Sequence, residues 1–279
     1  MKILFSFETY IVDPLRHSIR STMARPSLVF VPGAWHSPAH FSPVISHLTT
    51  LGYHCISAAL PSTGSETALA SFEPDVEVIR KAVLAELDRG QNVVLVTHSY
   101  GGIPGASALS GLSTKVRAAA GFSTSVVAIA MMCSFIVPAG SSLNVVRQGR
   151  DIPSWQVYDG DLLSFGPPGP EPLLYHDLPP AEASHWASLL RPWSFKVLDS
   201  KGLYSAWDDI PTSYLVCTLD KMIPPSQQRM MIQGALDGGA QIRVEEVESS
   251  HSPFLSMPER TAEFIRRAAG EKVGGITDS

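Results

Sequence analysis

Short apolar runs recur along the chain from Ser27 onward, separated by longer stretches of mixed polarity. Nearly continuous runs of this kind, rich in Val, Ile and Leu, are typical of parallel strands that are buried on both faces. We therefore expect six strands, over residues 27–31, 55–60, 92–97, 126–132, 213–218 and 242–247.

Between these runs, apolar residues return at intervals of three and four, which is the spacing of a helix that buries one face. The first such helix contains Phe41, Val44 and Leu48 and is closed by Gly52. The others are expected over 73–89, from about 102, and over 180–190, 226–237 and 258–269. This alternation predicts an α/β fold, with a mostly parallel sheet of about six or more strands and helices on both faces.

Residues 138–211 interrupt the alternation, because they hold ten of the 22 prolines and four of the five tryptophans. The pattern shows one clear regular element there, the helix over 180–190. We interpret the stretch as an insertion between two sheet strands, either a surface excursion or a lid whose aromatic side chains line an apolar pocket. The chemistry described below favours the lid.

The ends of the chain differ from this regular part. Residues 1–26 show no sustained period and are expected to form an N-terminal extension; Met23 could be the natural start, leaving 1–22 outside the native product. Residues 27–270 are expected to form one domain that includes the insertion. Residues 271–279 are expected to be a frayed tail.

Composition narrows the class of protein. Apolar residues make up 44% of the chain and charged residues 17%, so one large buried core is expected. The net charge is −5 and the basic residues are scattered, which argues against nucleic acid or an anionic membrane surface as partners. The apolar run over 126–137 ends at Pro138 and is too short to span a membrane. Acidic residues interrupt the N-terminal apolar stretch, which argues against a signal peptide.

The cysteines bear on compartment and metal content. Cys55, Cys133 and Cys217 lie far apart in apolar runs, so we expect reduced, buried thiols and a cytoplasmic protein. No closely spaced Cys or His cluster indicates a metal site, and no motif indicates an organic cofactor.

The segment Thr97-His98-Ser99-Tyr100-Gly101-Gly102 follows a predicted strand and opens a predicted helix. A nucleophilic serine in a hydrolase stands on such a sharp turn, with small residues two positions before and after it. Thr97 and Gly101 occupy those positions, although Gly is usual at the first. A serine in this kind of turn can also be a helix cap or part of a phosphate-binding loop.

Two later loops contain the groups that would activate this serine. A serine hydroxyl needs an imidazole to remove its proton, and the imidazole needs a carboxylate to orient it. Asp220 follows the strand 213–218, and His251 follows the strand 242–247. Each alone can be an ordinary loop residue, but their order after Ser99 and their place at strand ends match the requirement. Asp208 and Asp209 compete less well, because they precede their strand.

The loop after the first strand is the candidate oxyanion hole. The backbone N–H groups of Ala34 and Tyr100 are expected to bind the oxyanion, and Gly33 permits close backbone approach. We expect Gly33, Trp35 and His36 to contribute to substrate binding.

Four segments together resemble the α/β-hydrolase superfamily, in particular the branch with plant methyl esterases, hydroxynitrile lyases and their fungal and bacterial relatives. They are VFVPGAWH (29–36), VTHSYGG (96–102), CTLDKMIPPSQQ (217–228) and SSHSPFLSMPE (249–259). The resemblance covers about residues 27–270. It implies that Ser99 is the nucleophile, that Asp220 orients the histidine, and that His251 acts first as general base and then as general acid.

The same resemblance separates the possible reactions. The lyases carry a Thr where this chain has Gly33 and a Lys where it has Ser252, so cyanohydrin cleavage is disfavoured. We expect a serine hydrolase that cleaves a carboxylic ester or lactone of a small apolar or aromatic substrate. A macrolactone-forming or acyl-transfer enzyme and a non-catalytic ligand receptor on the same fold are the alternatives. A homodimer is possible, and no sequence feature demands one.

Overall fold

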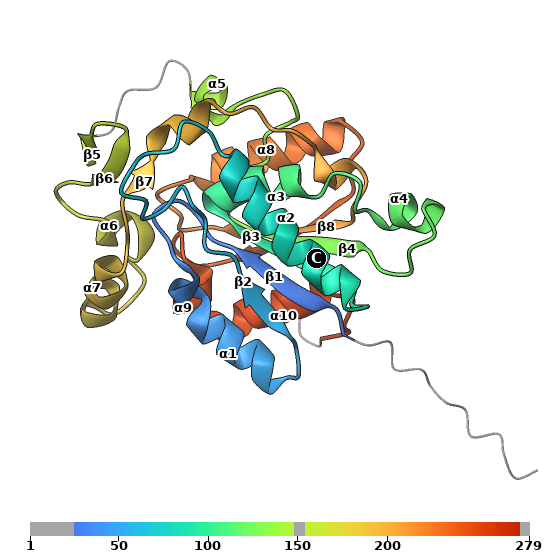
Figure 1. The fold of residues 1–279 in the computed structure, drawn as a ribbon. Helices are drawn as coiled ribbons and strands as arrows, with labels where there is room; N and C mark the ends of the chain where they lie inside the picture. Colours follow the sequence, from blue (N-terminus) through green and yellow to red (C-terminus); the bar gives the residue numbers. More distant parts are fainter. Residues whose placement is uncertain (1–24, 148–153, 274–279) are drawn as a thin grey trace, which may run out of the picture.

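A six-stranded parallel sheet forms the centre of the structure, a computed structural model that describes residues 25–147 and 154–273 (Figure 1). Its order is β2-β1-β3-β4-β8-β9, and each neighbouring pair is parallel. The strands are β1 (Ser27–Val31), β2 (Cys55–Ser57), β3 (Val93–His98), β4 (Val126–Met132), β8 (Thr212–Cys217) and β9 (Ile242–Val247). The six predicted strands are confirmed. β2 lies at an edge of the sheet and ends at Ser57, three residues before the predicted end.

Alternate residues of the central strands enter two separate cores. Leu28 and Phe30 of β1 belong to the core beneath α1 and α10, whereas Val29 and Val31 belong to the core beneath α2, α3 and α8. The helices are α1 (Ser42–Thr50), α2 (Glu73–Asp88), α3 (Gly102–Ala108), α8 (Pro225–Asp237) and α10 (Pro258–Ala268). The expected helices on both faces of the sheet are therefore confirmed.

The hydrophobic pattern did not predict several short helices, because a helix of one or two turns has too few residues to show a period. They are η1 (Pro38–Phe41), η2 (Ser99–Gly101), α4 (Thr114–Ala119), α5 (Leu143–Arg147), η3 (Phe195–Asp199), η4 (Ala206–Asp208) and α9 (Pro253–Ser256).

The insertion between β4 and β8 contains more regular structure than the sequence pattern indicates. An antiparallel sheet joins β5 (Gln156–Asp159), β6 (Leu162–Phe165) and β7 (Trp193–Ser194). Two helices, α6 (Glu171–Leu174) and α7 (Pro180–Ser188), lie between β6 and β7 in the chain. The prediction of a single regular element was wrong, because these strands have two to four residues and one partner comes from a distant part of the insertion.

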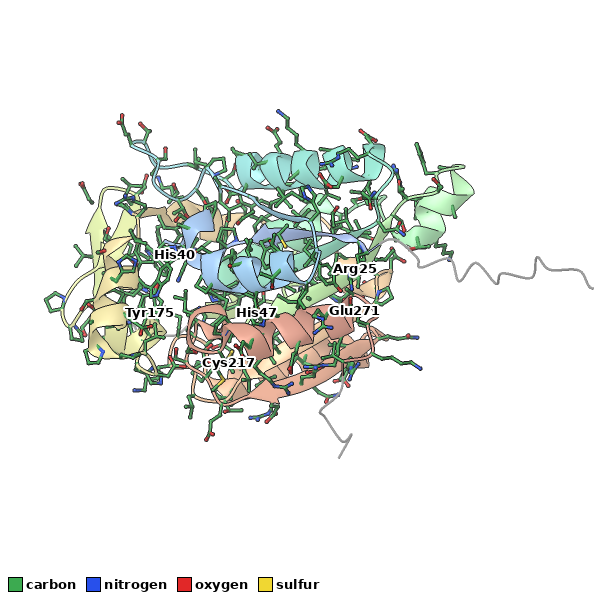
Figure 2. All side chains as sticks on the ribbon, turned by 90° about the horizontal axis from the view of Figure 1, so that it is seen from below. Arg25, His40, His47, Tyr175, Cys217 and Glu271 are labelled. Carbon is green, nitrogen blue, oxygen red and sulfur yellow. The ribbon has the colours of Figure 1, made fainter. Side chains whose placement is uncertain are left out.

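The first described residue lies beside the end of α10. Arg25 Nε donates to Glu271 Oε1 at 2.8 Å, and Arg266 donates to the other oxygen of the same carboxylate at 2.8 Å (Figure 2). Most of the predicted extension, residues 1–24, and most of the predicted tail, residues 274–279, lie outside the described residues.

The apolar run 126–137 begins with strand β4, as expected, and among the described residues no helix is long and apolar enough to cross a membrane. Cys55, Cys133 and Cys217 are free thiols; Cys133 and Cys217 are buried and Cys55 is partly exposed.

Candidate active site

Ser99 stands on a sharp turn between β3 and α3. Its φ is +51°, a left-handed conformation that is strained for a residue with a side chain. Two consecutive residues after β4 hold the turn, since Ser134 Oγ and the Phe135 N–H each donate to the Ser99 carbonyl oxygen at 3.0 Å. Thr97 fits two positions before Ser99 because its hydroxyl bonds to Ser134 Oγ at 3.1 Å.

Gly101 allows this turn to pack against the loop after β1. A Cβ at this position would lie 2.5 Å from the carbonyl oxygen of Pro32 and 2.7 Å from that of Val31. Both are backbone atoms, so no side-chain rotation can relieve the contact.

We expect Gly101→Ala to destabilise the fold by about 1–3 kcal/mol, as overpacking does, and to lower activity by displacing Ser99. Gly234→Ala is the matched control: Gly234 lies inside α8 with nothing within 4 Å of its added Cβ, so alanine should stabilise the protein by up to about 1 kcal/mol. Urea unfolding of the three proteins measures both effects. A Gly101→Ala protein as stable as the parent would contradict the close contact.

Asp220 and His251 form a buried pair at the carboxyl ends of β8 and β9. His251 Nδ1 lies 2.8 Å from Asp220 Oδ2, and both side chains are at most 2% exposed. Asp220 Oδ1 accepts from the N–H groups of Met222 (2.8 Å) and Ile223 (2.9 Å), and Gln228 Nε2 donates to Oδ2 at 3.1 Å. Because the carboxylate acts as an acceptor, Nδ1 of His251 carries the proton and Nε2 is left as the basic nitrogen.

The insertion reaches the loop that carries His251. Asp177 Oδ2 accepts from the Ser250 N–H at 2.8 Å and from Ser249 Oγ at 3.1 Å. Burial alone would raise the pKa of the Asp177 carboxyl, but the hydrogen bonds from Ser250 and its neighbours outweigh it and lower that pKa. Asp177 thus anchors the loop that carries His251. Its partners lie 72 and 73 residues away in the chain, so no local pattern in the sequence indicates this contact.

A cavity of about 170 Å³ opens on Ser99. Among the described residues the Ser99 hydroxyl has no hydrogen-bond partner, so it faces the cavity unengaged. Ala34 and Tyr100, the expected oxyanion residues, line the same cavity. Gly33 lets their loop approach, because a Cβ there would lie 2.9 Å from the Cβ of Ser99. Within the described parts of the chain, the remaining lining is mostly apolar and carries no charge: Trp35, Phe135, Leu143, Trp155, Gln156, Leu163, Trp193, Leu198, Met222 and Gln227.

Tryptophans from the first loop and the insertion pack together at this cavity. The ring centroid of Trp35 lies 5.4 Å from that of Trp193 and 6.0 Å from that of Trp155. Trp35 Nε1 also donates to the Leu163 carbonyl at 2.8 Å, which ties the loop to the small antiparallel sheet. The insertion therefore supplies one aromatic wall of the cavity.

His36 is not brought to the cavity. It is 2% exposed, its Nδ1 lies 2.9 Å from the Ala34 carbonyl oxygen, and the Tyr175 hydroxyl lies 2.9 Å from its Nε2. Burial, reinforced by nearby His40, holds the pKa of His36 well below its ordinary value. His36 therefore packs against His40 and Tyr175, both labelled in Figure 2, and holds the loop after β1 at Ala34. Of the three residues expected to contribute to substrate binding, Trp35 lines the cavity, whereas Gly33 and His36 do not. Asp208 and Asp209 lie before β8 and do not line the cavity.

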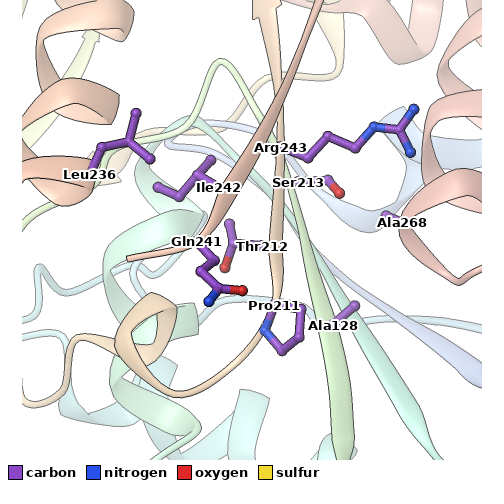
Figure 3. A pocket seen from close by; sticks show the side chains of 9 residues that line it. All are labelled: Ala128, Pro211, Thr212, Ser213, Leu236, Gln241, Ile242, Arg243 and Ala268. Carbon is purple, nitrogen blue, oxygen red and sulfur yellow. The ribbon is translucent and has the colours of Figure 1, made fainter. Parts of the chain in front are cut away.

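A larger hollow, of about 520 Å³, lies at the other end of the sheet (Figure 3). Its walls include Thr212 and Ile242, the first residues of β8 and β9, with Arg243 as its charged member. Ligands of open α/β sheets bind at the carboxyl ends of the strands, so this hollow is in the wrong place for the chemistry.

One group of side chains has the composition of a metal site. Ligand atoms of His98, Cys133 and His251 lie within 4.8 Å of one another. His98 Nε2 and Cys133 Sγ are both hydrogen-bonded to the His251 carbonyl oxygen, and His251 Nδ1 is bonded to Asp220. His98 Nε2, Cys133 Sγ and His251 Nδ1 are therefore already engaged in hydrogen bonds.

Comparison with known proteins bears on the fold and family of the chain as a whole. The model of the family described as "Alpha/beta hydrolase family" matches residues 28–264. A relative named alpha/beta hydrolase nvfD, from Aspergillus novofumigatus, is 32% identical over 253 residues, which is 90% of this chain and 99% of the relative. Methylesterase 1 of Arabidopsis thaliana is 25% identical and aligns over 88% of this chain and 96% of its own. The crystal structure of polyneuridine aldehyde esterase superposes with a TM-score of 0.70 at 16% identity, over 87% of this chain and 99% of that one.

Proposed function

Since this chain belongs to the alpha/beta hydrolase family, we propose that it is a serine hydrolase that cleaves a carboxylic ester through an acyl-enzyme. The observation that carries the proposal is the hydrogen-bonded pair of Asp220 and His251 beside a strained turn that presents Ser99 to a mostly apolar cavity.

Each step has a residue to perform it. Nε2 of His251 removes the Ser99 proton as Oγ attacks the ester carbonyl, and Asp220 stabilises the resulting imidazolium. The N–H groups of Ala34 and Tyr100 bind the oxyanion. The imidazolium then gives its proton to the departing alcohol, leaving Ser99 acylated. Water, deprotonated by His251, attacks the acyl carbonyl, and the released acid leaves Ser99 with its proton restored.

The cavity supports a small, neutral, apolar substrate. Among the residues that the structure describes, three tryptophans and no charged side chain line it. An apolar protein cavity of about 150 Å³ holds a benzene molecule, so about 170 Å³ suits one aromatic ring or a short acyl chain. Two of the similar proteins, a methylesterase and a polyneuridine aldehyde esterase, are named as esterases. A lactone would react in the same way, because it differs only in keeping the leaving hydroxyl tethered.

The direct test is rapid mixing of the protein with p-nitrophenyl acetate, together with labelling by a fluorophosphonate. We expect a burst of nitrophenolate equal to the enzyme concentration when deacylation is slower than acylation, and phosphonylation of Ser99 with loss of fluoride, seen by peptide mass spectrometry. A folded protein that neither turns over ester nor takes the label would contradict the proposal and favour a ligand receptor on the same fold.

The size of the cavity leads to a prediction on substrate length. We expect kcat/KM for p-nitrophenyl acetate to exceed that for the decanoate ester, because the longer chain does not fit. Trp155→Ala should narrow this ratio by about tenfold, since removing a wall residue is worth roughly 1–3 kcal/mol of discrimination. Trp186→Ala is the matched control, because Trp186 contacts His40 and does not line the cavity. An unchanged ratio in Trp155→Ala would show that the acyl chain lies elsewhere.

A further inference from the structure

We propose that His98, the residue before the nucleophile, and Cys133 are positioning residues that hold His251 by its backbone carbonyl oxygen. This inference rests on the proposed function, in which His251 is the general base. His98 Nε2 lies 2.9 Å from that oxygen, and the Cys133 thiol donates to it at 3.2 Å. All three residues are buried, with at most 2% of each exposed.

The same short segment after β4 also holds the nucleophile. Cys133 binds the carbonyl oxygen of His251, while the next two residues, Ser134 and Phe135, donate to the carbonyl oxygen of Ser99. His98 completes the connection, because it is covalently joined to Ser99 and hydrogen-bonded to His251. Residues 98 and 133–135 thus set the spacing between the attacking oxygen and its base, a spacing on which catalysis depends steeply.

The protonation of His98 is defined by its partner. A carbonyl oxygen only accepts, so Nε2 of His98 carries the hydrogen. Its Nδ1 is buried without a hydrogen-bond partner in the described part of the chain, and the added Cβ of a residue at Gly33 would lie 2.8 Å from it. Burial, with the neighbouring His251 and His36, holds the pKa of His98 well below its ordinary value. A neutral ring avoids a second positive charge beside His251, whose ring centroid lies 4.7 Å away.

Cys133 shows a further sign of this role. Its φ is +34°, in the left-handed region that a residue with a side chain rarely adopts. Such strain persists where surrounding contacts impose it, and it clusters at functional sites. Burial raises the pKa of the Cys133 thiol well above its ordinary value, so the sulfur keeps its hydrogen and remains a donor.

The test compares His98→Leu with His98→Gln, since the glutamine amide can donate to the His251 carbonyl and leucine cannot. We expect His98→Leu to lower kcat for p-nitrophenyl acetate by about 10- to 100-fold while KM changes less than about twofold. His98→Gln should recover to within about threefold of the parent. Cys133→Ser should likewise retain more activity than Cys133→Ala, because the hydroxyl replaces the thiol donor.

Thr212→Val is the control, because Thr212 is also buried and its hydroxyl also donates to a backbone carbonyl oxygen, that of Ile210 at 3.0 Å, at the opposite end of the sheet. We expect it to leave kcat within about threefold of the parent. Circular dichroism and the melting temperature identify any variant that fails to fold. A folded His98→Leu protein with parental kcat would overturn the proposal, and so would a folded His98→Gln protein as slow as His98→Leu.

A second readout separates this inference from the proposed function. The proton between His251 Nδ1 and Asp220 can be followed by NMR without any substrate. We expect its resonance to shift or broaden in His98→Leu and to return in His98→Gln. If the parent hydrolyses no ester, the proposed function fails and this readout still tests the positioning. An unchanged resonance in His98→Leu would contradict it.

Discussion

Ser99→Ala is expected to lower kcat/KM for p-nitrophenyl acetate by about 10⁴- to 10⁶-fold, as loss of the nucleophile does in a serine hydrolase. Alanine removes the only atom that can form the acyl-enzyme, while Asp220 and His251 keep their hydrogen bond. The residual activity would come from the oxyanion hole and from binding alone. The cavity loses one oxygen from its wall, so binding of the acid product should change by less than about threefold.

Stopped-flow measurement on parent and variant makes this result specific. The parent should give a burst of nitrophenolate, and Ser99→Ala should give none at the same protein concentration. Ser213→Ala is the control, because Ser213 lies in β8 at the hollow on the opposite end of the sheet. A burst that persists in a folded Ser99→Ala protein would identify a different nucleophile.

Asp220→Asn is expected to lower kcat by about 10³- to 10⁴-fold, a smaller loss than that of the nucleophile. The backbone N–H groups of Met222 and Ile223 donate to Oδ1, so the asparagine oxygen must take that position. The amide NH₂ then faces Nδ1 of His251, which must become an acceptor. The hydrogen of the imidazole moves to Nε2, and His251 can no longer remove the proton of Ser99.

Steady-state kinetics with p-nitrophenyl acetate measures this loss, and circular dichroism verifies that the variant is folded. Asp208→Asn is the matched control, since Asp208 lies before β8 and outside the cavity lining. We expect the control to keep kcat within about twofold. A folded Asp220→Asn protein with more than a tenth of parental kcat would show that another group orients His251.

The sheet and its main helices could be predicted because their signals are local. Val29 and Val31 face one core while Leu28 and Phe30 face the other, so the whole of β1 reads as a continuous apolar run. The insertion lacks such a signal. Its β6 pairs with β7 through Leu163 and Trp193, thirty residues apart, and neither strand is long enough to show a period.

The class of fold, the family resemblance and the order in which Ser99, Asp220 and His251 follow their strands could all be predicted from residue types and their spacing. This was possible because parallel strands end at one edge of the sheet, so residues after different strands are brought together. Three contacts became known from the folded chain alone: His36 is bonded to the Ala34 carbonyl oxygen, Asp177 anchors the loop of His251, and His98 binds the His251 carbonyl. The physical reason is distance along the chain: the partners of these residues are set by packing between elements, and hydrophobic periodicity reports only on neighbours within a few turns.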